Sequence, residues 1–162
     1  DSKLYAFYRK VFKDGNTDLM LTYAEYLLDE CETDKGMLVL KQAIKKGNAK
    51  AMDLYAYKLS KYDDSKAEAI KYFKLAIEKG NISAMFHYGD YLLNKEEKTA
   101  EEEAECASLL KKAIKGNHVG AMTSYAKYLL LHKEDDTYNE EAIKLLNRAI
   151  NNGDVKEFMR KY

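Results

Sequence analysis

Apolar residues recur along this chain at helical spacing, in pairs of stripes. After Gly47, one stripe runs from Ala51 to Leu59, with apolar residues at positions i, i+1, i+4, i+5 and i+8 counted from Ala51. A polar connection over residues 61–66 follows, and a second apolar stripe begins at Ala69. Stripes of this period predict amphipathic helices that bury one face. We therefore predict a unit of helix A, loop, helix B and sharp turn.

The same pattern returns at residues 15, 47, 80, 117 and 153, at intervals of 32, 33, 37 and 36 residues. Such a period is typical of stacked two-helix repeats, each packed on its neighbours. We therefore predict an all-α fold, a single solenoid over residues 1–162. Its predicted parts are a partial repeat with helix B only (1–14), repeat 1 (15–46), repeat 2 (47–79), repeat 3 (80–116), repeat 4 (117–152) and the start of a further repeat (153–162).

A glycine marks the sharp turn between successive repeats. Gly47, Gly80 and Gly153 each lie four residues beyond a helix B alanine, where helices commonly end in a left-handed residue. A residue that can cap a new helix follows each glycine. In repeat 4 the glycine comes one place early. We therefore expect Asn117 in the left-handed position and Gly116 in the last helical turn.

The loop from helix A to helix B varies in length, whereas the turn from helix B to helix A does not. From the last helix A leucine to the small residue of helix B the steps are 9 (27 to 36), 10 (59 to 69), 14 (92 to 106) and 13 (129 to 142) residues. Insertions therefore fall on one edge of the predicted array, as expected where the stacking geometry stays constant.

Charge and composition narrow the classes of partner. The chain has 27 basic and 27 acidic side chains, whereas binding of nucleic acid through phosphates normally requires a basic surplus. No stretch approaches the roughly 20 apolar residues of a membrane helix. We therefore expect a protein or peptide partner, with no nucleic acid and no insertion into a membrane.

The chain has two cysteines, Cys31 just past a predicted helix A and Cys106 inside a predicted helix B. They lie two repeats apart, so we expect no disulfide between them. A reducing compartment is the default for such a chain. We expect a cytoplasmic protein, while the endoplasmic reticulum and secretion stay open as alternatives.

The repeated residues resemble a known family. The pattern Lys-Ala-Ile-x-x-Gly-Asn-x-x-Ala-Met-x-x-Tyr-Ala-x-x-Leu, with a variable loop and a following Glu-Ala-Ile-Lys-Tyr-Phe, looks like Sel1-like repeats, which are relatives of tetratricopeptide (TPR) repeats. The resemblance covers essentially the whole chain. It implies a right-handed α-solenoid of antiparallel helix pairs that acts as an adaptor between proteins.

Candidate catalytic residues are few. Ser108-Leu-Leu-Lys111 and Ser124-Tyr-Ala-Lys127 match the Ser-x-x-Lys of penicillin-recognising enzymes, but the Ser-Asp-Asn and Lys-Thr-Gly elements of such sites do not occur. The three histidines lack i, i+4 spacing, and no cysteine lies near them at a zinc-like spacing. We therefore expect no catalytic residue, no cofactor and no metal site.

In related arrays helix A lines the concave surface, so the resemblance implies a candidate face for a partner. By register this face comprises Leu21, Glu25, Lys50, Asp53, Tyr57, Phe86, Asp90, Thr123 and Lys127. Tyr57 and Phe86 are large apolar side chains on a predicted exposed groove, where such side chains are natural binding anchors. The alternative is that both cover the sides of adjacent helices.

Tyrosines occupy two recurring positions on the predicted helices A. The first ladder is expected in the core and consists of Tyr23, Tyr55, Tyr88 and Tyr125. The second ladder consists of Tyr26, Tyr91 and Tyr128, with Lys58 in its place in repeat 2. The second ladder either packs between repeats or contributes to a binding face.

The leading function is a non-enzymatic protein–protein interaction module, an adaptor that binds a peptide or protein segment on its concave helix A surface. The alternative is an architectural solenoid fixed within a larger complex, or within a longer chain, and held through its ends and edges. A third hypothesis, an enzyme of the β-lactam-binding type, requires covalent labelling of Ser108 or Ser124.

Overall fold

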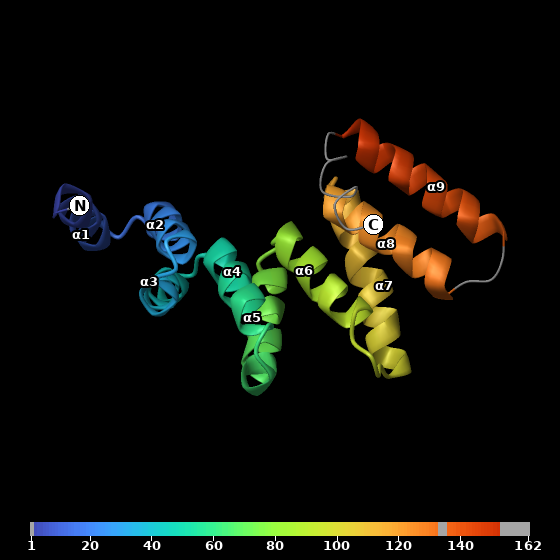
Figure 1. Cartoon of the computed structure of the whole chain (residues 1–162), viewed down its shortest axis with the longest axis horizontal. Coiled ribbons are helices and arrows are strands. Elements are labelled where there is room, and N and C mark those ends of the chain that lie inside the picture. Colours follow the sequence, from blue (N-terminus) through green and yellow to red (C-terminus); the bar gives the residue numbers. More distant parts are fainter. Residues whose placement is uncertain (1, 133–135, 153–162) are drawn as a thin grey trace. The chain divides into compact units, whose positions relative to one another are not determined.

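The computed structural model describes residues 2–132 and 136–152, and all regular elements in these ranges are helices (Figure 1). The elements are α1 (Ser2–Asp14), α2 (Thr17–Asp29), α3 (Thr33–Lys45), α4 (Ala49–Leu59), the short 3-10 helix η1 (Asp63–Ser65), α5 (Lys66–Glu78), α6 (Ile82–Leu93), α7 (Ala100–Lys115), α8 (Val119–His132) and α9 (Asp136–Asn151). The predicted all-α class is therefore confirmed. The right-handed superhelix stays a prediction.

The chain divides into two compact units, Asp1–Asn81 and Ile82–Tyr162. In the first unit α2 pairs with α3 and α4 with α5, while α1 packs on α2 and α3 on α4. In the second unit α6 pairs with α7 and α8 with α9, and α8 also contacts both α6 and α7. Within each unit, helices thus pack on their neighbours in the sequence, as hairpins do (Figure 1).

The helix pairs can be compared with the predicted repeat ranges. Helices α2 and α3 lie within 15–46, α4 and α5 within 47–79, α6 and α7 within 80–116, and α8 and α9 within 117–152. Helix α1 lies alone within 1–14. The predicted further repeat at 153–162, with its turn at Gly153, lies outside the described residues.

Small residues allow helix A and helix B of a pair to approach closely. They are Ala24, Ala56, Gly89 and Ala126 on the helices A, and Gly36, Ala69, Cys106 and Ala142 on the helices B, all buried. In the α6–α7 pair the larger side chain of Cys106 faces Gly89, which has no side chain. Cys106 Sγ donates to the Gly89 carbonyl oxygen at 3.2 Å. A Cβ on Gly89 would lie 3.0 Å from Leu110 Cδ2, so this contact has no spare space.

Left-handed residues end the helices at the turns between repeats, as predicted. The φ angle is +74° at Gly15, +84° at Gly47, +77° at Gly80 and +60° at Asn117. At the second turn, Gly47 N–H donates to Ile44 O at 2.8 Å and Asn48 N–H donates to Ala43 O at 3.2 Å, which are the two bonds of a Schellman motif. The left-handed position of Asn117 is therefore confirmed.

Gly116 lies one place beyond its predicted position in the last helical turn. Helix α7 ends at Lys115, and Gly116 is its C-cap with a φ of −81°. A Cβ at this position would lie 2.6 Å from Ile82 Cδ1. Glycine at 116 therefore permits close packing against α6 and is not required by a left-handed backbone.

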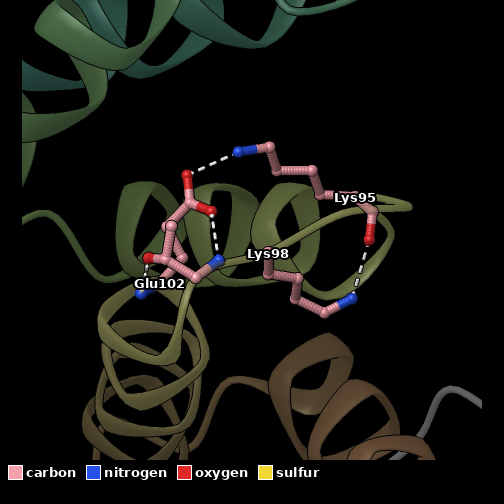
Figure 2. Close-up of polar contacts among 4 residues, drawn as sticks. Lys95, Lys98 and Glu102 are labelled. Carbon is pink, nitrogen blue, oxygen red and sulfur yellow. Dashed lines mark hydrogen bonds and ion pairs between the residues drawn. The ribbon is translucent and has the colours of Figure 1, made fainter.

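The longest connection, between α6 and α7, is held by its own polar side chains (Figure 2). Lys98 Nζ donates to Leu93 O at 3.0 Å and to Lys95 O at 2.7 Å, so it satisfies carbonyls at the end of α6. Thr99 Oγ1 accepts from Glu102 N–H at 3.2 Å, and Glu102 Oε2 accepts from Thr99 N–H at 3.0 Å, a capping box that starts α7. Glu102 Oε1 also pairs with Lys95 Nζ at 2.6 Å, and this hydrogen bond lowers the pKa of Glu102.

Candidate interaction surfaces

A row of polar side chains joins α6 to α8, the two helices A of the second unit. Ser124 Oγ donates to Asp90 Oδ1 at 2.6 Å, and Lys127 Nζ donates to Asn94 Oδ1 at 3.1 Å. Asn94 Nδ2 donates in turn to Asp90 Oδ2 at 3.2 Å. Asp90 and Asn94 are four residues apart and Ser124 and Lys127 are three apart, so the members of each pair lie on the same side of their helix. These four residues, here called the polar seam, form one hydrogen-bonded row across two repeats.

An aromatic pair lies at the start of the same helix contact. Phe86 on α6 and His118, directly before α8, stack with ring centroids 4.4 Å apart and planes inclined by 27°. His118 Nδ1 also accepts from Ala121 N–H at 3.3 Å, in the capping position that asparagines hold in the first unit. A Cβ on Gly120 would lie 2.8 Å from Phe86 Cζ. Phe86 is half-buried, so it packs on α8 and still presents part of its ring to solvent.

The structure brings four of the predicted partner-binding residues together on this contact. Phe86 and Asp90 come from α6, and Thr123 and Lys127 come from α8; all four are half-buried. Thr123 Oγ1 donates to Gly120 O at 2.8 Å, within its own helix. For Phe86, the contacts with His118 and Gly120 agree with the alternative that it covers an adjacent helix, although its ring is not fully covered.

The other five predicted residues lie in the first unit, at positions of unequal exposure. Leu21 and Asp53 are buried, so their side chains are not open to a partner. Glu25 and Lys50 are exposed. Tyr57 is exposed as well, and Lys61 Nζ lies 4.7 Å from its ring centroid, within the range of a cation–π contact.

Sequence reasoning did not place Asn94, Ser124 or His118 on the candidate face. A serine at position 124, inside an apolar stripe, was the available signal, because a buried hydroxyl needs a partner. Ser124 and Lys127 are also the second Ser-x-x-Lys match. Both are engaged in the polar seam, whereas Ser108 of the first match is exposed on α7.

Tyrosines of the first ladder are buried or half-buried, and two of them contact the preceding helix B within their own unit. Tyr55, Tyr88 and Tyr125 are buried and Tyr23 is half-buried. Lys41 Nζ on α3 lies 5.6 Å from the Tyr55 ring centroid, and Lys111 Nζ on α7 lies 5.4 Å from that of Tyr125. The same lysine-on-tyrosine contact thus joins repeats in both units.

The second tyrosine ladder is partly buried and partly exposed. Tyr128 is buried, and its hydroxyl donates to Glu103 Oε1 on α7 at 3.2 Å. Burial, assisted by the charge of Glu103, raises the pKa of Tyr128 to about 12. Tyr128 therefore packs between neighbouring repeats, whereas Tyr26 on α2 is exposed.

A hollow of about 380 Å³ lies in the first unit, where α2, α3 and the end of α4 meet. It is lined by Leu28, Thr33, Asp34, Met37, Lys58, Lys61 and Tyr62. Lys58 is the residue that replaces tyrosine in the second ladder. Two ammonium groups, one carboxylate and two hydroxyls thus lie around this space together with the apolar side chains of Leu28 and Met37, and its volume falls in the range of ligand pockets.

Other chemistry is sparse in the part of the chain that the structure describes. No group of three His, Cys, Asp or Glu side chains there could hold a metal ion. None of the helices described there combines the length and the apolar character that a membrane span requires. Cys31 and Cys106 are both free, and burial raises the pKa of the Cys106 thiol to about 11.

Comparison with known proteins assigns no family to this chain. No family model matches it, and no curated protein matches it. The resemblance to Sel1-like repeats accordingly stays a prediction that rests on the repeated residues themselves.

Proposed function

We propose that this chain is a non-enzymatic adaptor of the Sel1-like kind, a right-handed α-solenoid that binds a peptide or protein segment on its helix A surface. In the second unit we assign the binding face to Phe86 and the polar seam. The observation that carries the proposal is the hydrogen-bonded row from Ser124 through Asp90 and Asn94 to Lys127, beside a partly open aromatic ring. Two free cysteines suit work in the cytoplasm.

The polar seam suits an extended peptide because it offers both donors and acceptors. Backbone N–H and C=O groups of a bound peptide lose water and need such partners. Asp90 and Asn94 each have oxygen lone pairs beyond those used within the row. Their side chains are already held by hydrogen bonds, so binding would immobilise little additional side-chain freedom. The Phe86 ring would then contact one apolar side chain of the segment.

The proposal is tested by comparing two substitutions in the whole chain. Phe86→Ala removes the proposed anchor, and Leu131→Ala removes a leucine of α8 that is 65% exposed and lies outside the polar seam. Partners captured from native lysate by the unaltered protein are identified, and their affinities are measured by calorimetry. We expect Phe86→Ala to weaken binding by roughly tenfold or more, as for an interface anchor, and Leu131→Ala to leave it unchanged. Equal affinities for all three proteins, with unchanged helicity, would exclude this face.

An architectural role is the second candidate, and α9 provides the observation that favours it. Ile143 and Ile150 on α9 are 56% and 44% exposed, whereas Ile70 and Ile77 at the same positions of α5 are half-buried. An open apolar row of this kind is typical of a face that meets other protein. Sedimentation velocity tests this role. Self-association that Ile143→Lys/Ile150→Lys abolishes would favour it, and a monomer at all concentrations would argue against it.

A further inference from the structure

The hollow of the first unit lies at a repeat position that a bonded tyrosine–glutamate pair occupies in the second unit. By repeat register Lys58 corresponds to Tyr128, and Thr33 corresponds to Glu103. In the second unit Tyr128 is buried and its hydroxyl donates to Glu103 Oε1 at 3.2 Å. In the first unit Lys58 and Thr33 both line the hollow. In the first unit, threonine therefore replaces the glutamate of this pair, and the cation of Lys58 replaces the tyrosine.

The lining of the hollow matches an acidic side chain. Lys58 and Lys61 contribute two positive charges, against the single carboxylate of Asp34. Leu28 and Met37 are half-buried and offer apolar contact to methylene groups. A volume of about 380 Å³ accommodates an amino-acid side chain together with part of its backbone.

The position of Lys61 is supported by a further contact. Its Nζ lies 4.7 Å from the centroid of the exposed Tyr57 ring, so a cation–π contact orients this lining residue. A lysine held in this way loses less side-chain freedom when it pairs with a carboxylate. The first unit thus supplies two cations beside the hollow, one of which is oriented by an aromatic ring.

We propose that this hollow binds a glutamate or aspartate side chain presented by a protein partner. The partner's carboxylate meets Lys58 and Lys61 and takes the place that Glu103 occupies in the second unit. The hollow is a contact additional to the polar seam, and its occupation does not require the seam to bind anything.

The test uses the whole chain labelled with ¹⁵N and the blocked peptide Ala-Leu-Glu-Leu-Ala, with a twin that carries glutamine in place of glutamate. Amide signals of residues 28, 33–37 and 58–62 should move with the glutamate peptide, and its affinity should exceed that of the glutamine peptide by about fivefold. The Lys58→Gln/Lys61→Gln variant should abolish this preference. Lys112→Gln/Lys115→Gln, a pair with the same spacing at the exposed end of α7, should preserve it.

A second variant gives an effect of opposite sign. Asp34→Asn removes the one negative charge of the lining, so the glutamate peptide should bind about two- to fivefold more tightly. Equal binding of the two peptides, shifts confined to other residues, or an undiminished preference in Lys58→Gln/Lys61→Gln would each overturn the proposal. Phe86→Ala should leave the shifts at the hollow unchanged, so failure of the polar seam and failure of the hollow are distinguishable.

Discussion

The side-chain amide of Asn48 donates to Thr17 Oγ1 at 3.1 Å and thereby ties the start of α4 to the start of α2. The same nitrogen lies 3.3 Å from Asp18 Oδ1, while Asn48 Oδ1 accepts from Ala51 N–H at 2.9 Å and caps α4. The backbone N–H of Asn48 closes α3 through Ala43 O at 3.2 Å. One asparagine therefore ends a helix, starts the next and joins two repeats.

Replacing this asparagine separates its roles. Asn48→Ala should lower the free energy of unfolding by about 1–2 kcal/mol, because α4 loses its cap and α2 loses a hydrogen-bond donor. Asn48→Asp keeps the capping oxygen but loses the donor to Thr17 and places its carboxylate next to that of Asp18. Its free energy of unfolding should therefore lie between those of the unaltered protein and Asn48→Ala. Urea unfolding followed by circular dichroism measures both. An Asn48→Asp variant as stable as the unaltered protein would show that the link between repeats contributes nothing.

Close helix contact at Gly89 predicts an intolerance of even one methyl group. Gly89→Ala places a Cβ 3.0 Å from both Leu110 Cδ2 and Cγ, in a buried position. We expect a loss of about 1–3 kcal/mol in the free energy of unfolding, although alanine by itself favours the helix. Adding Leu110→Val to the Gly89→Ala variant should recover part of the lost free energy of unfolding. A Gly89→Ala variant at least as stable as the unaltered protein would contradict the tight packing of α6 on α7.

Much of the fold was predictable because it follows from local spacing. Helical periodicity gave the paired helices, and the spacing from the helix B alanine gave the left-handed position of Asn117. Gly116 lies one residue beyond its predicted place, and its requirement for glycine comes from Ile82 on α6, a contact between the two helices of one repeat that spacing does not reveal. Local rules thus predicted the helices, whereas a tertiary contact between helices explains this exception.

Alkaline pH should destabilise the second unit. Burial raises the pKa values of Tyr88 and Tyr128 to about 12, whereas tyrosines of the unfolded chain ionise near pH 10. Their contribution to stability is therefore complete below about pH 10 and is lost as pH rises toward 12. At about pH 11, ionisation of each of these tyrosines in the unfolded chain should reduce the free energy of unfolding by about 1 kcal/mol.

The Tyr128→Phe variant isolates one of these two groups. Between about pH 8 and pH 11, the free energy of unfolding of Tyr128→Phe should fall by about 1 kcal/mol less than that of the unaltered protein. This holds even though the variant lacks the hydrogen bond to Glu103. Urea unfolding at both pH values gives the comparison. An identical loss in the two proteins would show that Tyr128 ionises equally in the folded and unfolded chains.

The connection between α6 and α7 should resist proteolysis because Lys98 holds its carbonyl groups. Lys98→Met removes the hydrogen bonds to Leu93 O and Lys95 O, so local opening at the exposed Glu96 and Glu97 should become about five- to tenfold more frequent. A glutamate-specific protease under native conditions reports this opening as a cleavage rate. Lys115→Met, at an exposed position of α7, is the matched control and should leave the rate unchanged.

The candidate face was less predictable than the fold. Register placed Leu21 and Asp53 on the same line as Phe86 and Thr123, yet the first two are buried. Repeat spacing defines equivalent positions, but the burial of each depends on the side chains that happen to pack against it. The polar seam and the hollow escaped prediction for the same reason, because each unites residues about 25 to 35 positions apart in the chain.

Site-specific photo-crosslinking from a position beside the polar seam tests the proposed binding face most directly. Benzoylphenylalanine is placed at position 123 on α8, which leaves the four seam residues intact, and in a separate protein at position 131 on the same helix, before exposure to native lysate. We predict that one partner crosslinks from position 123 and not from position 131, and that Phe86→Ala in the same chain removes this product. Crosslinking of the same partner from position 131 alone, unaffected by Phe86→Ala, would contradict binding at the polar seam.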